Sequence, residues 1–72
     1  MTNLQMEIIE ELEKHSLFGI AQAARESWEN RSFYYCRHSC PFELRVRIAE
    51  GNREMVAAAS RTFVDQIAAV SH

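Results

Sequence analysis

The sequence contains little glycine, proline or cysteine and no long hydrophobic run. Its 72 residues include only two glycines, so a glycine-rich loop of the kind that cradles phosphate is absent. The longest purely apolar runs are only a few residues, against the roughly 20 that a membrane-spanning helix needs. The two cysteines are expected to be reduced thiols, because disulfides seldom persist in a reducing cytosol. The sequence therefore predicts no phosphate-binding loop, no membrane span and no disulfide.

Positive charge is also scarce. The formal net charge is −2, which argues against the broad electrostatic attraction that drives most nucleic-acid binding. Four glutamates precede the first lysine, whereas a secretory signal opens with a cationic segment. We therefore expect a cytoplasmic protein that is neither exported nor bound to a membrane.

The chain has the size of one small domain, residues 1–72. Its 47% apolar and 25% charged residues are typical of a folded globular protein. At this size only about 60% of the unfolded surface is buried on folding, which leaves a small margin of stability. Small domains usually gain further stability from a disulfide, a metal or a second subunit. Because no disulfide is expected, a second subunit is the natural source.

Apolar residues recur at helical spacing in four segments, which predicts a mainly α fold built as a small bundle of three to four short helices. The predicted helices cover residues 3–14, 17–30, 41–50 and 53–70. The N-cap candidates are Thr2, which forms a capping box with Gln5, and Ser16 and Asn52. Phe63 lies at the middle of the apolar stripe of the last helix, so we expect it to be buried.

Residues 32–49 also fit a β-hairpin. Apolar and polar residues alternate from Phe42 to Ile48, as in a half-buried strand, and residues 33–35 would supply the pairing strand of an α-α-β-β-α fold. Pro41 and Gly51 instead suit the start and the end of a helix. On that helix Phe42 and Leu44 point to different sides, so the segment would be buried on two sides. We favour the helix and keep the hairpin as the alternative.

Aromatic and arginine side chains concentrate in the central stretch, residues 32–48. These residue types are enriched at interface hot spots, because they combine a large contact area with a polar group. We therefore predict a small accessory or regulatory protein that binds another protein and self-associates as a homodimer. The predicted contact residues are Phe33, Tyr34, Tyr35, Arg37, Arg45 and Arg47.

The alternative function is a small nucleic-acid-binding regulator. In it the arginines would contact phosphate groups, while the neighbouring aromatic rings would stack on bases. The arginines concerned are Arg31, Arg37, Arg45 and Arg47.

Cys36, His38 and Cys40 lie within five residues and offer three zinc ligands. A structural zinc site needs a fourth ligand, and such sites usually draw on a second pair of ligands, whereas only single histidines at 15 and 72 remain here. We therefore expect no metal and no other cofactor. No segment combines a nucleophile, a base and a pocket, so we also expect neither enzymatic activity nor a small-molecule substrate.

Overall fold

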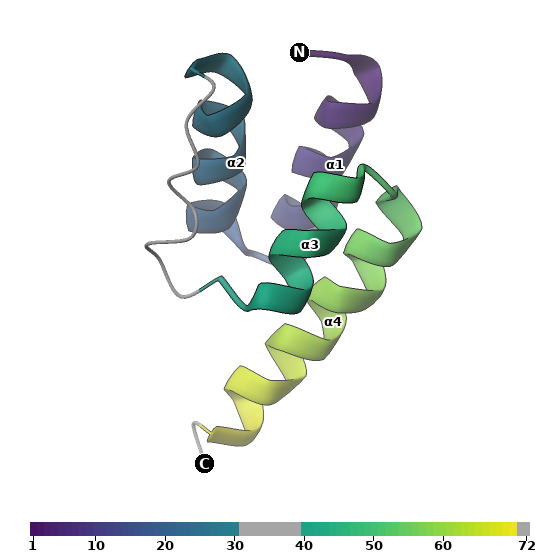
Figure 1. Cartoon of the computed structure of the whole chain (residues 1–72). Helices are drawn as coiled ribbons and strands as arrows, with labels where there is room; N and C mark the ends of the chain where they lie inside the picture. The colour runs from purple at the N-terminus through teal and green to yellow at the C-terminus, as the bar shows by residue number, and fades with distance from the viewer. Residues whose placement is uncertain (31–39, 71–72) are drawn as a thin grey trace.

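The structure of the chain is a computed structural model that describes residues 1–30 and 40–70. Every regular element in these ranges is an α-helix, and no strand occurs within them (Figure 1). The helices are α1 (Asn3–Lys14), α2 (Phe18–Asn30), α3 (Phe42–Glu50) and α4 (Arg53–Val70). The predicted four-helix fold is confirmed. The hairpin alternative is wrong for its second strand, which is helical, and residues 32–39 of its first half lie outside the described residues.

The helices form two hairpins that meet along α1. This helix contacts both α2 and α4, and α3 packs on α4. In Figure 1, α1 and α2 run side by side in opposite directions, as is usual for two helices joined by a short connection. Within the described residues, no helix is long and apolar enough to cross a membrane.

The core lies where the apolar faces of the helices meet. Its largest apolar side chains that are almost fully buried are Ile8, Leu12, Leu44, Ile48 and Val56. Burying an aliphatic side chain of this size stabilises the fold by about 1.5–3 kcal/mol. On α2, alanines 21, 23 and 24 are buried as well. Their small side chains allow α2 to approach its neighbour closely.

Side-chain caps fix the starts of α1 and α4. The Thr2 hydroxyl accepts a hydrogen bond from the Gln5 amide at 3.1 Å, and the Gln5 side chain accepts one from the Thr2 amide at 2.9 Å. Before α4, the Asn52 side chain accepts from the Met55 amide at 3.2 Å. The caps predicted at Thr2 and Asn52 are confirmed. Each satisfies backbone donors that a helix start otherwise leaves to water.

Ser16 does not cap α2, so that prediction is wrong. Its backbone is left-handed, with φ 62°, and its amide donates to the Glu13 carbonyl at 2.9 Å. The Leu17 amide donates to the Leu12 carbonyl at 3.0 Å. These two bonds form a Schellman motif, which ends α1 and satisfies carbonyls of its last turn. The Ala21 amide donates to the Leu17 carbonyl, so Leu17 stands at the N-cap position of α2.

Helix α3 is buried on one side rather than two. Leu44 and Ile48 are each 1% exposed, whereas Phe42 is 70% exposed. The expectation of burial on both sides is therefore wrong. The reason is the position of α3 at the outside of the bundle, where its main contact is with α4. Its other side lacks a helix to pack against among the described residues.

Helix α4 is longer than the helices it packs against. Its 18 residues extend about 27 Å, whereas the 12 residues of α1 extend about 18 Å. Figure 1 shows the C-terminal part of α4 passing beyond the other three helices. Phe63 packs against the edge of the core and is only partly buried, so its predicted burial is half correct. The residues beyond it, 65–70, are exposed.

Candidate protein-interaction surface

The Phe42 ring is exposed because of its place at the start of α3. Pro41 occupies the N-cap position with an extended backbone, φ −61° and ψ 149°, and its carbonyl accepts from the Arg45 amide at 3.0 Å. Phe42 is thus the first helical residue. Since helical side chains lean toward the N-terminus, its ring projects past the end of the helix instead of into the core.

Arg45 covers the Phe42 ring. The guanidinium carbon lies 5.3 Å from the ring centroid, within the range of a cation–π interaction. Both residues come from one helix at a spacing of three, which brings their side chains together. The pair therefore presents a held aromatic ring and a positive charge side by side at the surface. The structure describes two of the predicted contact residues, Arg45 and Arg47, and Arg45 is the one that packs on an exposed aromatic ring.

Arg47 is occupied by two carboxylates of its own helix. It donates to Glu43 at 3.0 Å and to Glu50 at 2.9 Å. The hydrogen bond to Glu50 is the main cause that raises the pKa of the Arg47 guanidinium above its ordinary value, so this side chain stays charged. Its charge is balanced within α3, which leaves Arg47 a weaker candidate for contact with a partner than the sequence predicted.

A groove of about 310 Å³ lies between α3 and α4. Its lining residues are Pro41, Glu43, Leu44, Arg47, Met55, Ala58, Ala59, Thr62, Phe63 and Gln66. The floor is mostly apolar, and the Glu43–Arg47 ion pair stands on the α3 side. We call this feature the α3–α4 groove.

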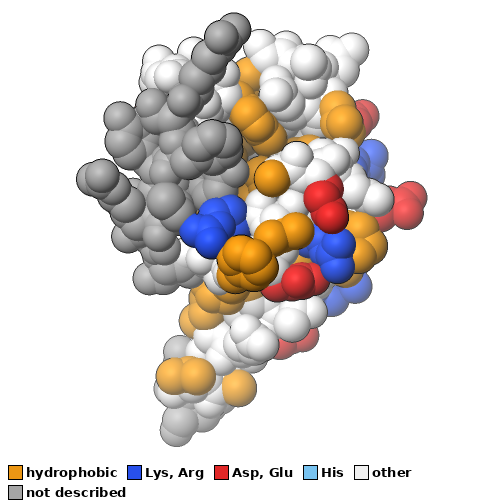
Figure 2. Space-filling model, viewed as in Figure 1, with side chains coloured by type: hydrophobic (Ala, Val, Ile, Leu, Met, Phe, Trp, Pro, Cys, Tyr) orange, Lys and Arg blue, Asp and Glu red, His pale blue; other side chains and the backbone are white. Residues whose placement is uncertain are grey.

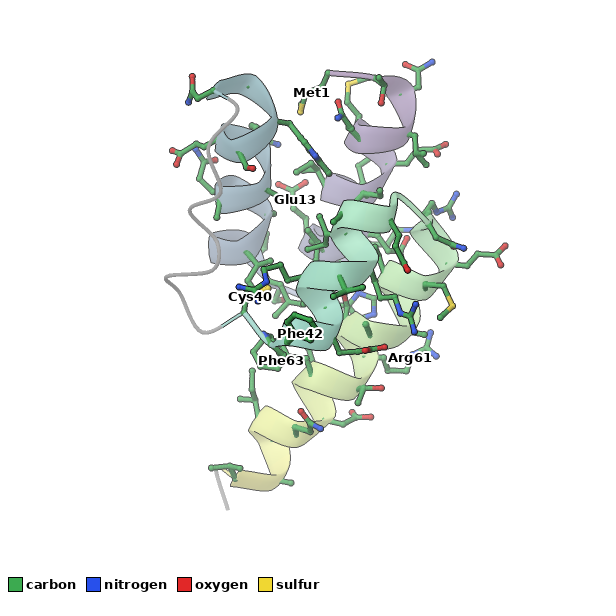
Figure 3. The ribbon with its side chains drawn as sticks, in the orientation of Figure 1. Met1, Glu13, Cys40, Phe42, Arg61 and Phe63 are labelled. Carbon is green, nitrogen blue, oxygen red and sulfur yellow. The ribbon has the colours of Figure 1, made fainter. Side chains whose placement is uncertain are left out.

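The groove continues onto the projecting end of α4. Phe63 and Gln66 line both the α3–α4 groove and a shallower apolar hollow that Ile67 and Val70 complete. In Figure 2, hydrophobic side chains gather beside the start of α3 and along the C-terminal part of α4. Figure 3 shows Phe42 and Phe63 where the start of α3 meets the middle of α4, with Arg61 on another side of that helix. The Phe42–Arg45 pair and the α3–α4 groove therefore belong to one surface.

Cys40, the last residue before Pro41, carries a protonated thiol. Burial raises its pKa to about 11, against a smaller opposing effect of the nearby Arg45 charge. The thiol lies 3.8 Å from the Pro41 carbonyl, to which it donates a weak hydrogen bond. A thiol in this state is a poor nucleophile and a poor metal ligand, because both roles require the thiolate.

Of the other candidate zinc ligands at positions 15, 36 and 38, the structure describes His15. His15 ends α1, where its Nδ1 donates to the Glu11 carbonyl at 2.9 Å. No group of three or more histidine, cysteine, aspartate or glutamate residues able to hold a metal occurs in residues 1–30 and 40–70. Cys36 and His38 lie outside the described residues.

Four of the six predicted contact residues, Phe33, Tyr34, Tyr35 and Arg37, also lie outside the described residues, so their part in the surface stays a prediction. Gln66, Ile67 and Val70 are surface residues that the sequence pattern did not reveal, because periodicity alone places Ile67 and Val70 in a buried stripe. One signal was present: the last predicted helix is 18 residues long, longer than any other helix available to cover it.

Comparisons of the chain with protein-family models, with curated proteins and with solved structures returned no match.

Proposed function

We propose that the chain is a small cytoplasmic accessory or regulatory protein that acts by binding another protein. The contact surface joins the Phe42–Arg45 pair to the α3–α4 groove. The observation that carries the proposal is the state of Phe42: a large aromatic side chain is 70% exposed and is held in place by Arg45. Aromatic and arginine side chains supply most hot-spot residues at protein interfaces.

The geometry favours protein binding for a physical reason. An aromatic ring that is already held loses little conformational freedom when a partner covers it, so more of its contact energy remains as affinity. The α3–α4 groove beside it offers apolar surface with a charged rim, the composition of a typical interface. The central-stretch residues Phe33, Tyr34, Tyr35 and Arg37 lie three to seven positions before Cys40 in the sequence, and we propose that they extend this surface.

Two described arginines, Arg47 of α3 and Arg53 of α4, do not favour the nucleic-acid alternative. Arg47 pairs with two glutamates, and Arg53 pairs with Glu11 at 3.5 Å. The carboxylate beside each guanidinium offsets the positive charge that would otherwise attract phosphate. Phosphate binding of this kind weakens steeply with added salt, so a lack of DNA or RNA retardation even at low salt would exclude the alternative.

A pair of matched variants tests the proposal. Phe42 and Phe18 are each the first residue of a helix, and their exposed fractions are 70% and 60%. We expect Phe42→Ala to remove the proteins that the wild-type chain captures from cell lysate, as measured by quantitative mass spectrometry, whereas Phe18→Ala retains them. Equal capture by all three proteins would contradict the assignment of the surface. Both substitutions remove an exposed ring, so neither is expected to unfold the chain.

A further inference from the structure

The projecting end of α4 combines exposure with an apolar composition. Residues 65–70 are all exposed, although four of the six are Ile67, Ala68, Ala69 and Val70. Ile67 is 46% exposed and Val70 is 86% exposed. Short helices are only marginally stable in water without packing. A helical end of this composition therefore calls for a covering surface.

The exposed apolar residues share one side of the helix. At 100° per residue, Phe63, Gln66, Ile67 and Val70 fall within a stripe about 100° wide. The same four residues line one shallow hollow. We call them the α4 stripe. It contains no charged residue, and Arg61 and Asp65 lie roughly on the opposite side of the helix.

We propose that the α4 stripe binds the α4 stripe of a second copy of this chain, with the two helices antiparallel and a twofold axis beside Gln66 and Ile67. This inference rests on the proposed function and names the partner for one part of the surface. In this register, Phe63 of each copy packs against Val70 of the other. Gln66 and Ile67 of the two copies meet near the axis.

The stripe suits a second copy because it is complementary to itself. In a twofold contact a residue near the axis meets its own counterpart, so a charge there would face an equal charge. The α4 stripe has none. Its polar member, Gln66, carries an amide that both donates and accepts hydrogen bonds, so two copies of Gln66 can pair with each other. Recognition of a partner through charge would instead require a charged residue on the α4 stripe.

The size of the chain and the size of the α4 stripe set the expected affinity of the dimer. Domains of this size usually gain stability from a disulfide, a metal or a second subunit, and the described cysteine of this 72-residue chain, Cys40, is a free thiol. The stripe covers about two helical turns, which is less than the roughly 800 Å² per partner of a standard stable interface. We therefore expect a reversible dimer with a dissociation constant in the micromolar range.

Sedimentation equilibrium of the full chain between roughly 10 and 500 micromolar measures this association directly. We expect a monomer–dimer equilibrium for the wild type. Ile67→Asp places two like charges near the axis, and Val70→Asp buries a charge against Phe63 of the second copy, so each should weaken the dimer at least about tenfold. Ala68→Asp adds the same charge on the other side of the same turn and should leave the dissociation constant unchanged.

A cysteine placed beside the axis tests the register. Gln66→Cys should form an oxidised dimer through residue 66, identified by mass spectrometry of the linked peptide, because the two copies of this position then lie within disulfide reach. Ala68→Cys should not. A wild-type chain that stays monomeric up to the highest concentration overturns the proposal. So does a dimer that the three aspartate variants leave intact, or weaken equally.

These outcomes separate the dimer from the proposed function. Retained capture of a foreign protein by a monomeric wild type would contradict the dimer alone, whereas an intact dimer whose capture is insensitive to Phe42→Ala would contradict the foreign-partner surface alone.

Discussion

Glu11 of α1 forms an ion pair with Arg53 of α4, with 3.5 Å between the carboxylate Oε2 and the guanidinium Nε. The same oxygen lies 3.5 Å from the ammonium group of Lys14. The Glu11 side chain is only 10% exposed, whereas both cations are more than half exposed. One carboxylate thus links the last part of α1 to the start of α4.

A double-mutant cycle measures this link. We expect Glu11→Gln and Arg53→Gln to show a coupling free energy of about 0.5–1 kcal/mol in urea unfolding, and the coupling should shrink as salt screens the charges. Arg61→Gln, on the exposed side of the same helix, is the control and should show no coupling to Glu11→Gln. A Glu11–Arg53 coupling indistinguishable from the control would mean that this ion pair does not hold the hairpins together.

Two left-handed residues give a reciprocal test of helix termination. Ser16, with φ 62°, ends α1, and Gly51, with φ 75°, ends α3. A residue with a side chain pays roughly 1 kcal/mol for this conformation relative to glycine, so Ser16→Gly should raise the free energy of unfolding and Gly51→Ser should lower it, each by about that amount. A side chain at position 51 has room, because its Cβ would meet Leu4 Cδ2 at 3.6 Å. Changes of the same sign in the two variants would contradict this account.

The position of the core predicts which of two substitutions by alanine lowers the free energy of unfolding more. Leu12 is fully buried between α1 and its neighbours, so Leu12→Ala should cost about 3 kcal/mol. Phe63 is only partly buried at the core edge, so Phe63→Ala should cost less, about 1–2 kcal/mol, although it removes a larger side chain. Urea unfolding of the two variants decides the order. A larger loss for Phe63→Ala would show that the core extends further along α4 than the structure places it.

The raised pKa of Cys40 predicts slow alkylation. With a pKa of about 11 instead of 9.0, the folded chain should carry roughly 100-fold less Cys40 thiolate near neutral pH than the unfolded chain. We therefore expect iodoacetamide to modify Cys40 much more slowly in the folded protein than in urea. Trypsin cleaves after Arg37, so mass spectrometry can follow Cys36 and Cys40 on separate peptides. Equal rates in the two states would contradict the burial of this thiol.

The raised pKa of Cys40 also makes the stability of the fold depend on pH. Between pH 9 and about 11 the unfolded chain releases the Cys40 proton while the folded chain keeps it, so the contribution of this thiol to stability falls as pH rises through that window. Below pH 9 both states are protonated and the contribution is constant. The decline above pH 9 should be smaller in Cys40→Ala, as measured by urea unfolding at each pH.

Local sequence signals predicted the helices well, because their causes are local. The Thr2–Gln5 capping box, the Asn52 cap and the left-handed Gly51 depend on residues within one helical turn, and all three appear as expected. Ser16 was assigned to the wrong helix end. A serine before an apolar residue suits an N-cap, and nothing in the local sequence reveals that its backbone is left-handed.

The burial of each helix face depended on neighbours that periodicity cannot supply. The alternation of Phe42 and Leu44 showed two apolar sides of α3, but only the position of α3 at the outside of the bundle decides that Leu44 is buried and Phe42 is exposed. In the same way, the apolar spacing of Phe63, Ile67 and Val70 identified a face, whereas the lengths of the other helices decide that the face passes beyond its own core.

The most direct test of the central claim is a residue-by-residue comparison of amide NMR spectra across a dilution series. If α4 presents a docking surface to a second copy, the amides of Gln66, Ile67 and Val70 should shift as the protein concentration falls from roughly 500 to 10 micromolar, while those of the buried face of α1 stay fixed. Spectra that do not change with concentration, or changes confined to α1 and α2, would contradict the account.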